Sequence, residues 1–180
     1  MIKFKQSLHT FLLQIRQVQD ILYTIIESCL EWKWHQMRHI GGVKMKIDVA
    51  TGSDYAYIRE RDLHISESLI QSKIKGNEIY ILRNEDDNNI GWMRYGYFWD
   101  NTPFMNLIWV DEQYRGKGAG KQVVLFWEEQ MNQKGFKLLM TSTQSDEGAQ
   151  HFYRKLGYKD AGCLVLDTQP MEILLTKNLS

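Results

Sequence analysis

A glycine-rich turn between an apolar run and an amphipathic segment constrains the fold of this chain more than any other stretch. Residues 106–110 form a short, mostly apolar run with β-branched and aromatic side chains, which predicts a strand. Apolar residues at helical spacing over 123–131 predict a helix that begins near Lys117. Between the two lie three glycines, Gly116, Gly118 and Gly120. We expect the rest of the chain to be organised around this strand–turn–helix unit.

The turn has the features of an anion-binding site. Glycines at a strand-to-helix turn let main-chain N–H groups curl around an anion, and the helix N-terminus adds a partial positive charge. Basic side chains lie in or beside the same turn, at Arg115, Lys117 and Lys121. An ordinary tight turn is the alternative, but the spaced glycines together with this charge favour a phosphate site.

The spacing excludes two common nucleotide-binding motifs. A Walker A loop needs a glycine five residues before its Gly-Lys pair and a Ser or Thr after it. Here those positions hold Arg115 and Gln122. The dinucleotide fingerprint needs a further glycine where this chain has Lys121. The phosphate ligand is therefore of another kind.

Composition narrows the class of protein. A length of 180 residues is long enough for one domain with a sizeable core, and the 22 basic residues balance the 22 acidic ones. We therefore expect neither a nucleic-acid nor a membrane partner. Cys29 and Cys163 form no paired framework, which suits the reducing cytoplasm, and Cys163 is expected to be a buried small residue. His35 and His39 lack a third ligand, so no metal site is expected.

Residues 1–44 differ from the rest of the chain. Apolar residues recur there at steps of three and four from Phe4 to Cys29, which predicts an amphipathic helix. One interpretation is a helical extension that packs on the domain or on a second copy of the chain, as in a homodimer. The other is a translated leader, because consecutive glycine codons at 41–42 can spell a ribosome-binding sequence shortly before Met45. The sequence leaves both interpretations open.

Residues 45–180 alternate between strand and helix patterns and form the second predicted unit, an α/β domain. Strands are expected near 45–50, 78–83, 90–99, 103–110, 137–143, 158–166 and 171–177. Helices are expected after Ser53, from Ser66 to Gly76, from about Lys117 to Lys134 and near 146–156. No repeat or low-complexity linker divides this unit.

Two motifs in this domain resemble those of a known family. The string 115–120, Arg-Gly-Lys-Gly-Ala-Gly, is similar to the pyrophosphate loop Arg/Gln-x-x-Gly-x-Gly/Ala of the GCN5-related N-acetyltransferases. Residues 149–158 resemble that family's signature Ala-x-x-Phe-Tyr-x-x-Leu-Gly-Phe/Tyr, at the expected distance after the loop. The resemblance covers about three-quarters of the chain. It implies a mixed, mostly antiparallel sheet with helices on both faces.

The resemblance also implies a cofactor and the residues that hold it. Acetyl-CoA would place its pantetheine arm beside Ile108 and Val110, with the Val110 N–H facing the thioester oxygen. The pyrophosphate would lie in the loop, against Arg115, Gly116, Lys117, Gly118, Ala119, Gly120 and Lys121. Asp146 stands where the family often has an asparagine that contacts the cofactor. An acidic group suits a polyphosphate poorly, and the alternative role for Asp146 is to cap the following helix.

Tyr153 is the predicted catalytic acid, because the motif places it beside the thioester sulphur. The chemistry implied is direct attack of a primary amine of a small molecule or peptide on acetyl-CoA, followed by protonation of the departing thiolate. A half-buried tyrosine with only Phe152 in the core is the structural alternative for Tyr153. Candidate bases are Glu60, Asp62, His64 and Asp100, none of which is singled out by a motif. A non-catalytic acyl-CoA-binding sensor or interaction module is the alternative function.

Overall fold

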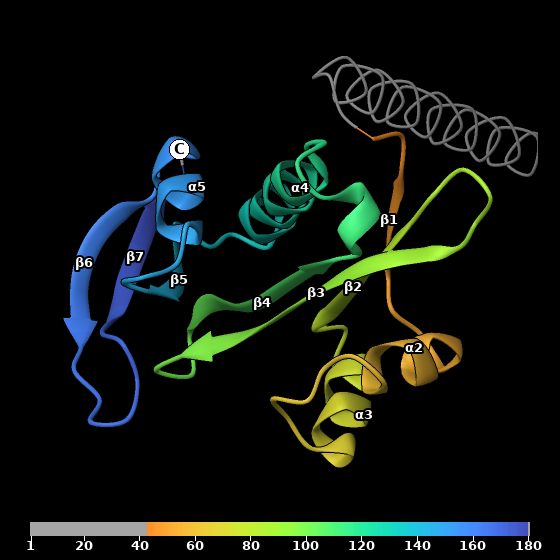
Figure 1. Cartoon of the computed structure of the whole chain (residues 1–180), viewed down its shortest axis with the longest axis horizontal. Helices are drawn as coiled ribbons and strands as arrows, with labels where there is room; N and C mark the ends of the chain where they lie inside the picture. The colour runs from red at the N-terminus through yellow and green to blue at the C-terminus, as the bar shows by residue number, and fades with distance from the viewer. Residues whose placement is uncertain (1–42, 180) are drawn as a thin grey trace, which may run out of the picture. The chain divides into compact units, whose positions relative to one another are not determined.

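A computed structural model describes residues 43–179 (Figure 1). The predicted helix within residues 1–44 and the choice between extension and leader lie almost wholly outside these residues. The strands are β1 (Lys46–Val49), β2 (Ile79–Arg83), β3 (Asn89–Phe98), β4 (Thr102–Val110), β5 (Leu138–Gln144), β6 (Lys159–Leu164) and β7 (Glu172–Asn178). They form one seven-stranded sheet in the order β1-β2-β3-β4-β5-β7-β6. No helix within 43–179 is long and apolar enough to cross a membrane.

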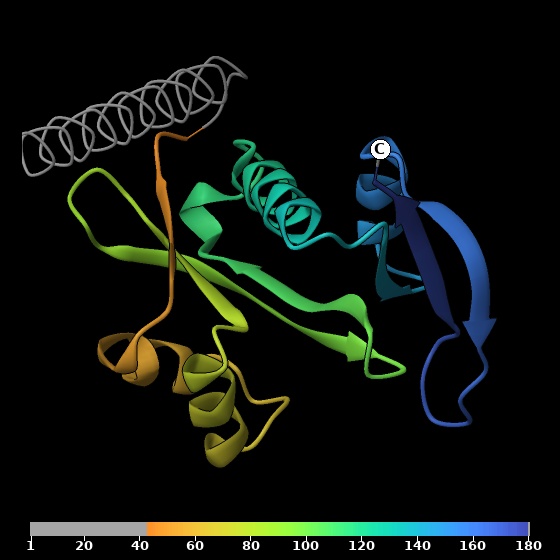
Figure 2. The same cartoon turned by 180° about the vertical axis from the view of Figure 1, so that it is seen from behind.

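Helices cover both faces of the sheet, as expected (Figures 1 and 2). The short η1 (Gly52–Asp54), α2 (Tyr55–Arg59) and α3 (Glu67–Lys75) lie on one face, and α4 (Ala119–Gln133) and α5 (Ala149–Lys155) on the other. Successive side chains of a strand point to opposite faces of the sheet, so each central strand contributes apolar residues to the core on both faces. In β2, for example, Tyr80 and Leu82 join the core under α4, whereas Ile79 and Ile81 join the core under α2 and α3.

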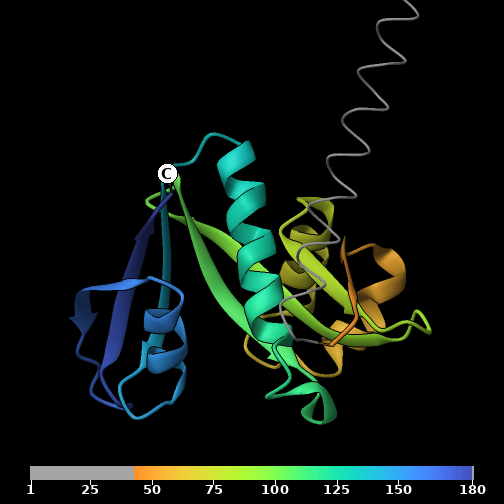
Figure 3. The same cartoon turned by 90° about the horizontal axis from the view of Figure 1, so that it is seen from above.

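The sheet is open in its middle. Strands β1 to β4 are each antiparallel to the next, and β5, β7 and β6 form a second antiparallel group. The two groups meet only where β4 runs parallel to β5, at Phe104 beside Met140 and Met105 beside Thr141. Beyond Met105 the two strands diverge (Figure 3). The rest of β4, up to Val110, therefore borders a gap.

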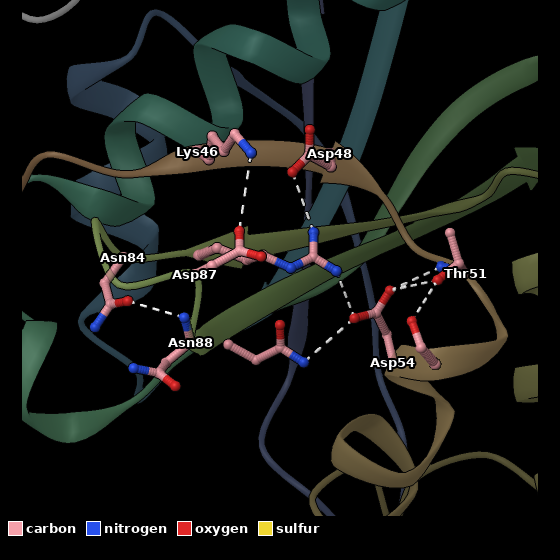
Figure 4. A network of polar contacts seen from close by, with 10 residues as sticks. Lys46, Asp48, Thr51, Asp54, Asn84, Asp87 and Asn88 are labelled. Carbon is pink, nitrogen blue, oxygen red and sulfur yellow. Dashed lines mark hydrogen bonds and ion pairs between the residues drawn. The ribbon is translucent and has the colours of Figure 1, made fainter.

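A polar network fixes η1 and the β1–β2 edge of the sheet (Figure 4). Arg83 donates to Asp48 at 3.1 Å and to the buried Asp54 at 2.6 Å. The other oxygen of Asp54 accepts the Thr51 main-chain N–H at 2.8 Å. Burial alone would raise the pKa of the Asp54 carboxyl, but the Thr51 N–H and the Arg83 guanidinium outweigh burial and hold it below its usual value. Asp54 therefore stays charged and closes the turn.

The helix predicted to begin near Lys117 begins at Ala119, because Gly118 holds the left-handed φ of +87° just before it. One local expectation was wrong: Cys163 is exposed rather than buried. It lies on β6, an edge strand whose six residues are all exposed.

Candidate active site

One edge of β4 presents main-chain groups to the gap that no neighbouring strand pairs with. The Asp111 N–H donates to the Ile90 carbonyl at 2.9 Å, on the β3 side. Main-chain groups of successive strand residues point to opposite edges of a strand. Those of Trp109 and Asp111 therefore face β3, and those of Ile108 and Val110 face the gap. Ile108 and Val110, the two residues predicted to lie beside the pantetheine arm, thus share the open edge.

The glycine turn borders a cavity of about 500 Å³. Gly116 and Gly118 have φ of +70° and +87°, values that residues with a Cβ rarely adopt, so the turn requires glycine there. The lining residues are Val110, Tyr114, Arg115, Gly116, Gly118, Ala119, Gly120, Lys121, Phe152, Lys155 and Leu156. The cavity thus joins the gap edge of β4 to the N-terminus of α4 and one face of α5.

The N-terminus of α4 supplies hydrogen-bond donors to this cavity. The first N–H groups of a helix have no partner within the helix, and here the first main-chain bond is that of Gln122 to the Gly118 carbonyl. The preceding N–H groups, of Ala119, Gly120 and Lys121, are thus available to an anion. A Cβ on Gly120 would lie 3.6 Å from the Phe152 ring, so a larger side chain there would fill this space.

The basic residues of the turn have different surroundings. Lys121 lines the cavity, together with Lys155 of α5. Arg115 also lines it, but its Nε–H donates to the Val110 carbonyl at 2.7 Å. Lys117 does not line it, and its main-chain carbonyl accepts the Val43 N–H at 3.1 Å. The three basic residues predicted to act together thus differ: Lys121 lines the cavity, Arg115 lines it while bonded to the protein, and Lys117 lies outside it.

Tyr153 lies buried near the point where β4 and β5 meet. Its side chain is 8% exposed and packs edge-on against Tyr158, with 5.7 Å between ring centres. Burial raises the pKa of the phenol, the nearby Glu147 carboxylate adds to the rise, and the Thr141 hydroxyl opposes it. Thr141 is the β5 residue beside Met105, and its hydroxyl donates to the Met105 carbonyl at 3.0 Å. The phenol is thus protonated at neutral pH. Tyr153 lies near Thr141, where β4 and β5 are still paired, and is not among the residues that line the cavity.

The alternative interpretation of Tyr153, as a half-buried packing residue beside Phe152, gives the wrong burial for both side chains. That alternative placed Phe152 alone in the core, but Tyr153 is the buried residue and Phe152 lines the cavity. Adjacent residues of a helix point about 100° apart, so only the fold decides which of the two faces the sheet.

Asp146 is neither a cavity residue nor a helix cap. It is exposed in the turn before α5, and the residue at the N-cap position is Gly148. The neighbouring Glu147 makes the local contact instead, accepting the Thr143 hydroxyl at 2.8 Å. This placement gives no support to the predicted cofactor contact of Asp146.

The candidate bases do not gather at the gap. Asp62 is buried and paired with Arg94 at 2.7 Å, so it holds the loop after α2. Glu60, His64 and Asp100 are exposed, and none of the four lines the cavity.

Sequence reasoning missed four lining residues, Tyr114, Phe152, Lys155 and Leu156. A signal for three of them was present. Within the second motif, Lys155 and Leu156 follow Phe152 by three and four residues, a spacing that places all three on one face of a helix. Tyr114 lies in the short η2 (Glu112–Tyr114) and had no such pattern.

The fold and the site define a class of protein: a mixed sheet with a glycine-rich turn and a cavity beside an open strand edge. The chain belongs to the acetyltransferase (GNAT) family, whose model matches residues 27–158. This match covers most of the chain and includes both motifs.

Solved structures with the same fold are numerous. A chain of the NatC complex bound to Gag peptide and CoA is 16% identical, with a TM-score of 0.66 over 77% of this chain and 100% of its own. The ribosomal-protein-S18-alanine N-acetyltransferase from Escherichia coli is 17% identical, with a TM-score of 0.62 over 76% and 95%. Spermidine/spermine N-acetyltransferase SpeG from Vibrio cholerae is 11% identical, with a TM-score of 0.62 over 75% and 92%. A search of curated protein sequences found no match.

The residues present fit the acetyl-CoA that the family uses. The left-handed glycines leave the turn open, with no atom within 4 Å of a Cβ built on Gly116. The N–H groups at the start of α4 suit a pyrophosphate, and Lys121 and Lys155 supply positive charge beside it. The open edge of β4 suits the amide groups of a pantetheine arm.

Proposed function

We propose that this protein is an N-acetyltransferase that moves the acetyl group of acetyl-CoA to a primary amine by direct attack in a ternary complex. The observation that carries the proposal is the alignment of three features along β4. The glycine turn lies at one end of the gap, the open edge of β4 borders it, and the buried phenol of Tyr153 lies near Thr141, where β4 and β5 are still paired.

The chain's own groups have separate roles in binding the cofactor. The N–H groups of the turn and of the start of α4, from Gly116 to Lys121, hold the pyrophosphate. The main-chain groups of Ile108 pair with the pantetheine arm as a neighbouring strand would, and the Val110 N–H donates to the thioester oxygen, whereas the Val110 carbonyl is held by Arg115. The donor is then fixed by main-chain groups, with its acetyl group toward the closed end of the gap.

Tyr153 acts as the general acid. When the amine attacks the thioester carbon, the C–S bond breaks and the thiolate leaves with the electron pair. The Tyr153 hydroxyl transfers its proton to that sulphur, the attacking nitrogen releases a proton to water, and the Tyr153 phenolate then takes a proton back from water. The raised pKa of Tyr153 keeps the phenol protonated until the thiolate forms.

Similar folds occur in enzymes named for peptide or protein acceptors and for spermidine and spermine. Both acceptor classes therefore remain within the proposal. A panel of polyamines, amino sugars, amino acids and peptide N-termini, assayed for thiol release from acetyl-CoA, tests it directly. We expect release with one class of amine and none when the amine is omitted. Tight CoA binding without release for any amine would favour a non-catalytic acyl-CoA sensor.

A further inference from the structure

Arg115 stands between two cavities at the end of β4. One is the cavity of the glycine turn. The other, of about 630 Å³, is lined by Trp109 and by Arg61, which follows α2. Arg115 lines both cavities. Its side chain is therefore placed to act on β4 itself as well as on a ligand in the turn.

The guanidinium of Arg115 is engaged by the protein in two ways. Its Nε–H donates to the Val110 carbonyl at 2.7 Å. Its central carbon lies 4.8 Å from the centre of the Trp109 ring. A planar guanidinium can stack on an aromatic ring and donate within its own plane at the same time, which an ammonium group cannot do.

This contact completes the fixing of one peptide unit at the end of β4. The Val110 carbonyl and the Asp111 N–H belong to the same peptide group. The N–H donates to the Ile90 carbonyl at 2.9 Å, and the carbonyl accepts from Arg115. The peptide is thus held from both edges of the strand, and hydrogen bonds arranged in such a chain strengthen one another.

The ring under Arg115 is itself held in place. The Trp109 indole N–H donates to Asp111 at 3.3 Å, and the same carboxylate oxygen accepts the Tyr57 hydroxyl at 3.0 Å. Tyr57 belongs to α2, so the support for Arg115 extends to the helices on the other face of the sheet. Arg115 therefore rests on a fixed platform.

We propose that Arg115 is a positioning residue for the cofactor edge of β4, and that this role outweighs any contact with the pyrophosphate. The inference rests on the proposed function, because the edge matters through its pairing with the pantetheine arm. By fixing the peptide after Val110, Arg115 holds the Val110 N–H at the angle at which it meets the donor. It also joins the glycine turn to the strand that precedes it.

Two substitutions separate the positioning role from a phosphate contact. Arg115→Lys keeps the positive charge but puts a methylene where Nε stood. Arg115→Gln loses the charge but puts an amide N–H donor at that bonded position. For a positioning residue, the lysine variant binds CoA about tenfold more weakly, the loss expected for one charge-assisted hydrogen bond, and the glutamine variant loses less. For a phosphate ligand the order is reversed.

Calorimetry with CoA gives this order, with Arg59→Lys as a matched control, because Arg59 is an exposed arginine that pairs with Glu67 at the surface. Unless Arg115→Lys is the weaker binder of the two variants, the proposal is wrong. Hydrogen exchange over residues 107–113 without ligand supplies a second readout. It should quicken in Arg115→Lys and stay near wild type in Arg115→Gln.

The exchange experiment also separates this inference from the proposed function. Failure of the wild-type protein to bind CoA would remove the function but leave the exchange pattern intact. Unchanged exchange in Arg115→Lys would remove the positioning role even if CoA binds.

Discussion

At the scale of single residues, Tyr153 carries the chemical prediction. Tyr153→Phe keeps the buried ring and removes the only proton that the side chain can give. We expect turnover on the true acceptor to fall by roughly 10²–10⁴-fold, the usual value of general acid help. CoA affinity and melting temperature should change little. Steady-state kinetics beside calorimetry measures both effects.

A change of leaving group provides the control for Tyr153. An acyl donor with a more acidic thiol needs less protonation as it departs, so Tyr153→Phe should cost less with that donor. Equal losses with both donors, or unaltered turnover, would show that the hydroxyl does not protonate the thiolate.

Asp54 carries a prediction about pH. Its pKa is lower in the folded protein than in the unfolded chain, so the unfolded chain takes up its proton first as the pH falls. The stabilisation is therefore fully present above the unfolded value of about 4 and is lost as the pH falls through the lower folded value. Asp54→Asn should reduce the free energy of unfolding by about 3 kcal/mol at pH 7, as expected when one partner of a buried pair is removed. The difference from wild type should shrink in acid.

Urea unfolding at several pH values measures this difference. Asp160→Asn is the matched control, because Asp160 also pairs with an arginine, Arg154, but more than half of its side chain is exposed. That exposed pair is screened by solvent and should contribute little at any pH. A difference for Asp54→Asn that stays constant from neutral to acid pH would contradict the role given to its charge.

Single residues also show how far the sequence could be read. Motif spacing predicted Gly118, Gly120 and Tyr153 for one candidate site; the two glycines line the cavity, whereas Tyr153 is buried and is not among its lining residues. Motif spacing could not assign Arg115 to the Val110 carbonyl, because that contact depends on how the chain turns between the two residues. The burial of Asp62 was missed for a similar reason, since its partner Arg94 lies 32 residues away on β3.

At the scale of elements, the turn before α4 depends on the small size of Gly120. Gly120→Leu would place side-chain atoms between the start of α4 and Phe152, where a Cβ alone lies 3.6 Å from the ring. CoA should raise the melting temperature of the wild type, because it binds the folded state, but not that of this variant. Differential scanning fluorimetry with and without CoA makes the measurement.

Gly52→Leu is the control for that experiment. A Cβ on Gly52 meets no atom within 4 Å, and Gly52 begins η1 rather than bordering the cavity. This variant should keep the rise produced by CoA. If Gly120→Leu keeps it as well, the turn is not the pyrophosphate site.

Elements were predicted better than their pairing. The expected strands and helices of 45–180 correspond to those observed within a few residues, because hydrophobic spacing reports local structure. The gap beyond Met105 could be expected only from the family resemblance, since no local pattern in β4 or β5 records which residues stop pairing. The full exposure of β6 was not predicted either, because it depends on packing: no residue of that strand joins either core cluster.

At the scale of the whole molecule, the predicted boundary at Met45 falls inside a set of contacts. The Val43 N–H donates to the Lys117 carbonyl at 3.1 Å, and the Val43 carbonyl accepts from Gln122 at 3.0 Å. A chain that begins at Met45 loses both ties to the glycine turn and α4. We expect it to fold but to bind CoA several-fold more weakly than the full chain, on the scale of one to two hydrogen bonds.

A chain that begins at Gly41 keeps these ties and is the control. It should bind CoA like the full chain if residues 1–40 are dispensable for the domain. Aggregation or a changed subunit number in both shortened chains would favour the packed extension. Light scattering together with calorimetry distinguishes the outcomes, and full affinity in the chain that begins at Met45 would contradict the role given to Val43.

The short join between β4 and β5 makes the sheet mechanically uneven. Two register pairs connect its halves, whereas β3 with β4 and β5 with β7 are paired along most of their length. A force that pulls the two halves of the sheet apart would meet few main-chain hydrogen bonds between β4 and β5. It would therefore separate the two antiparallel groups before either of them unfolded. A ligand arm hydrogen-bonded along the open edge of β4 would fill the gap between β4 and β5. The small molecule would then resist separation of the two halves, as an additional strand of the protein would.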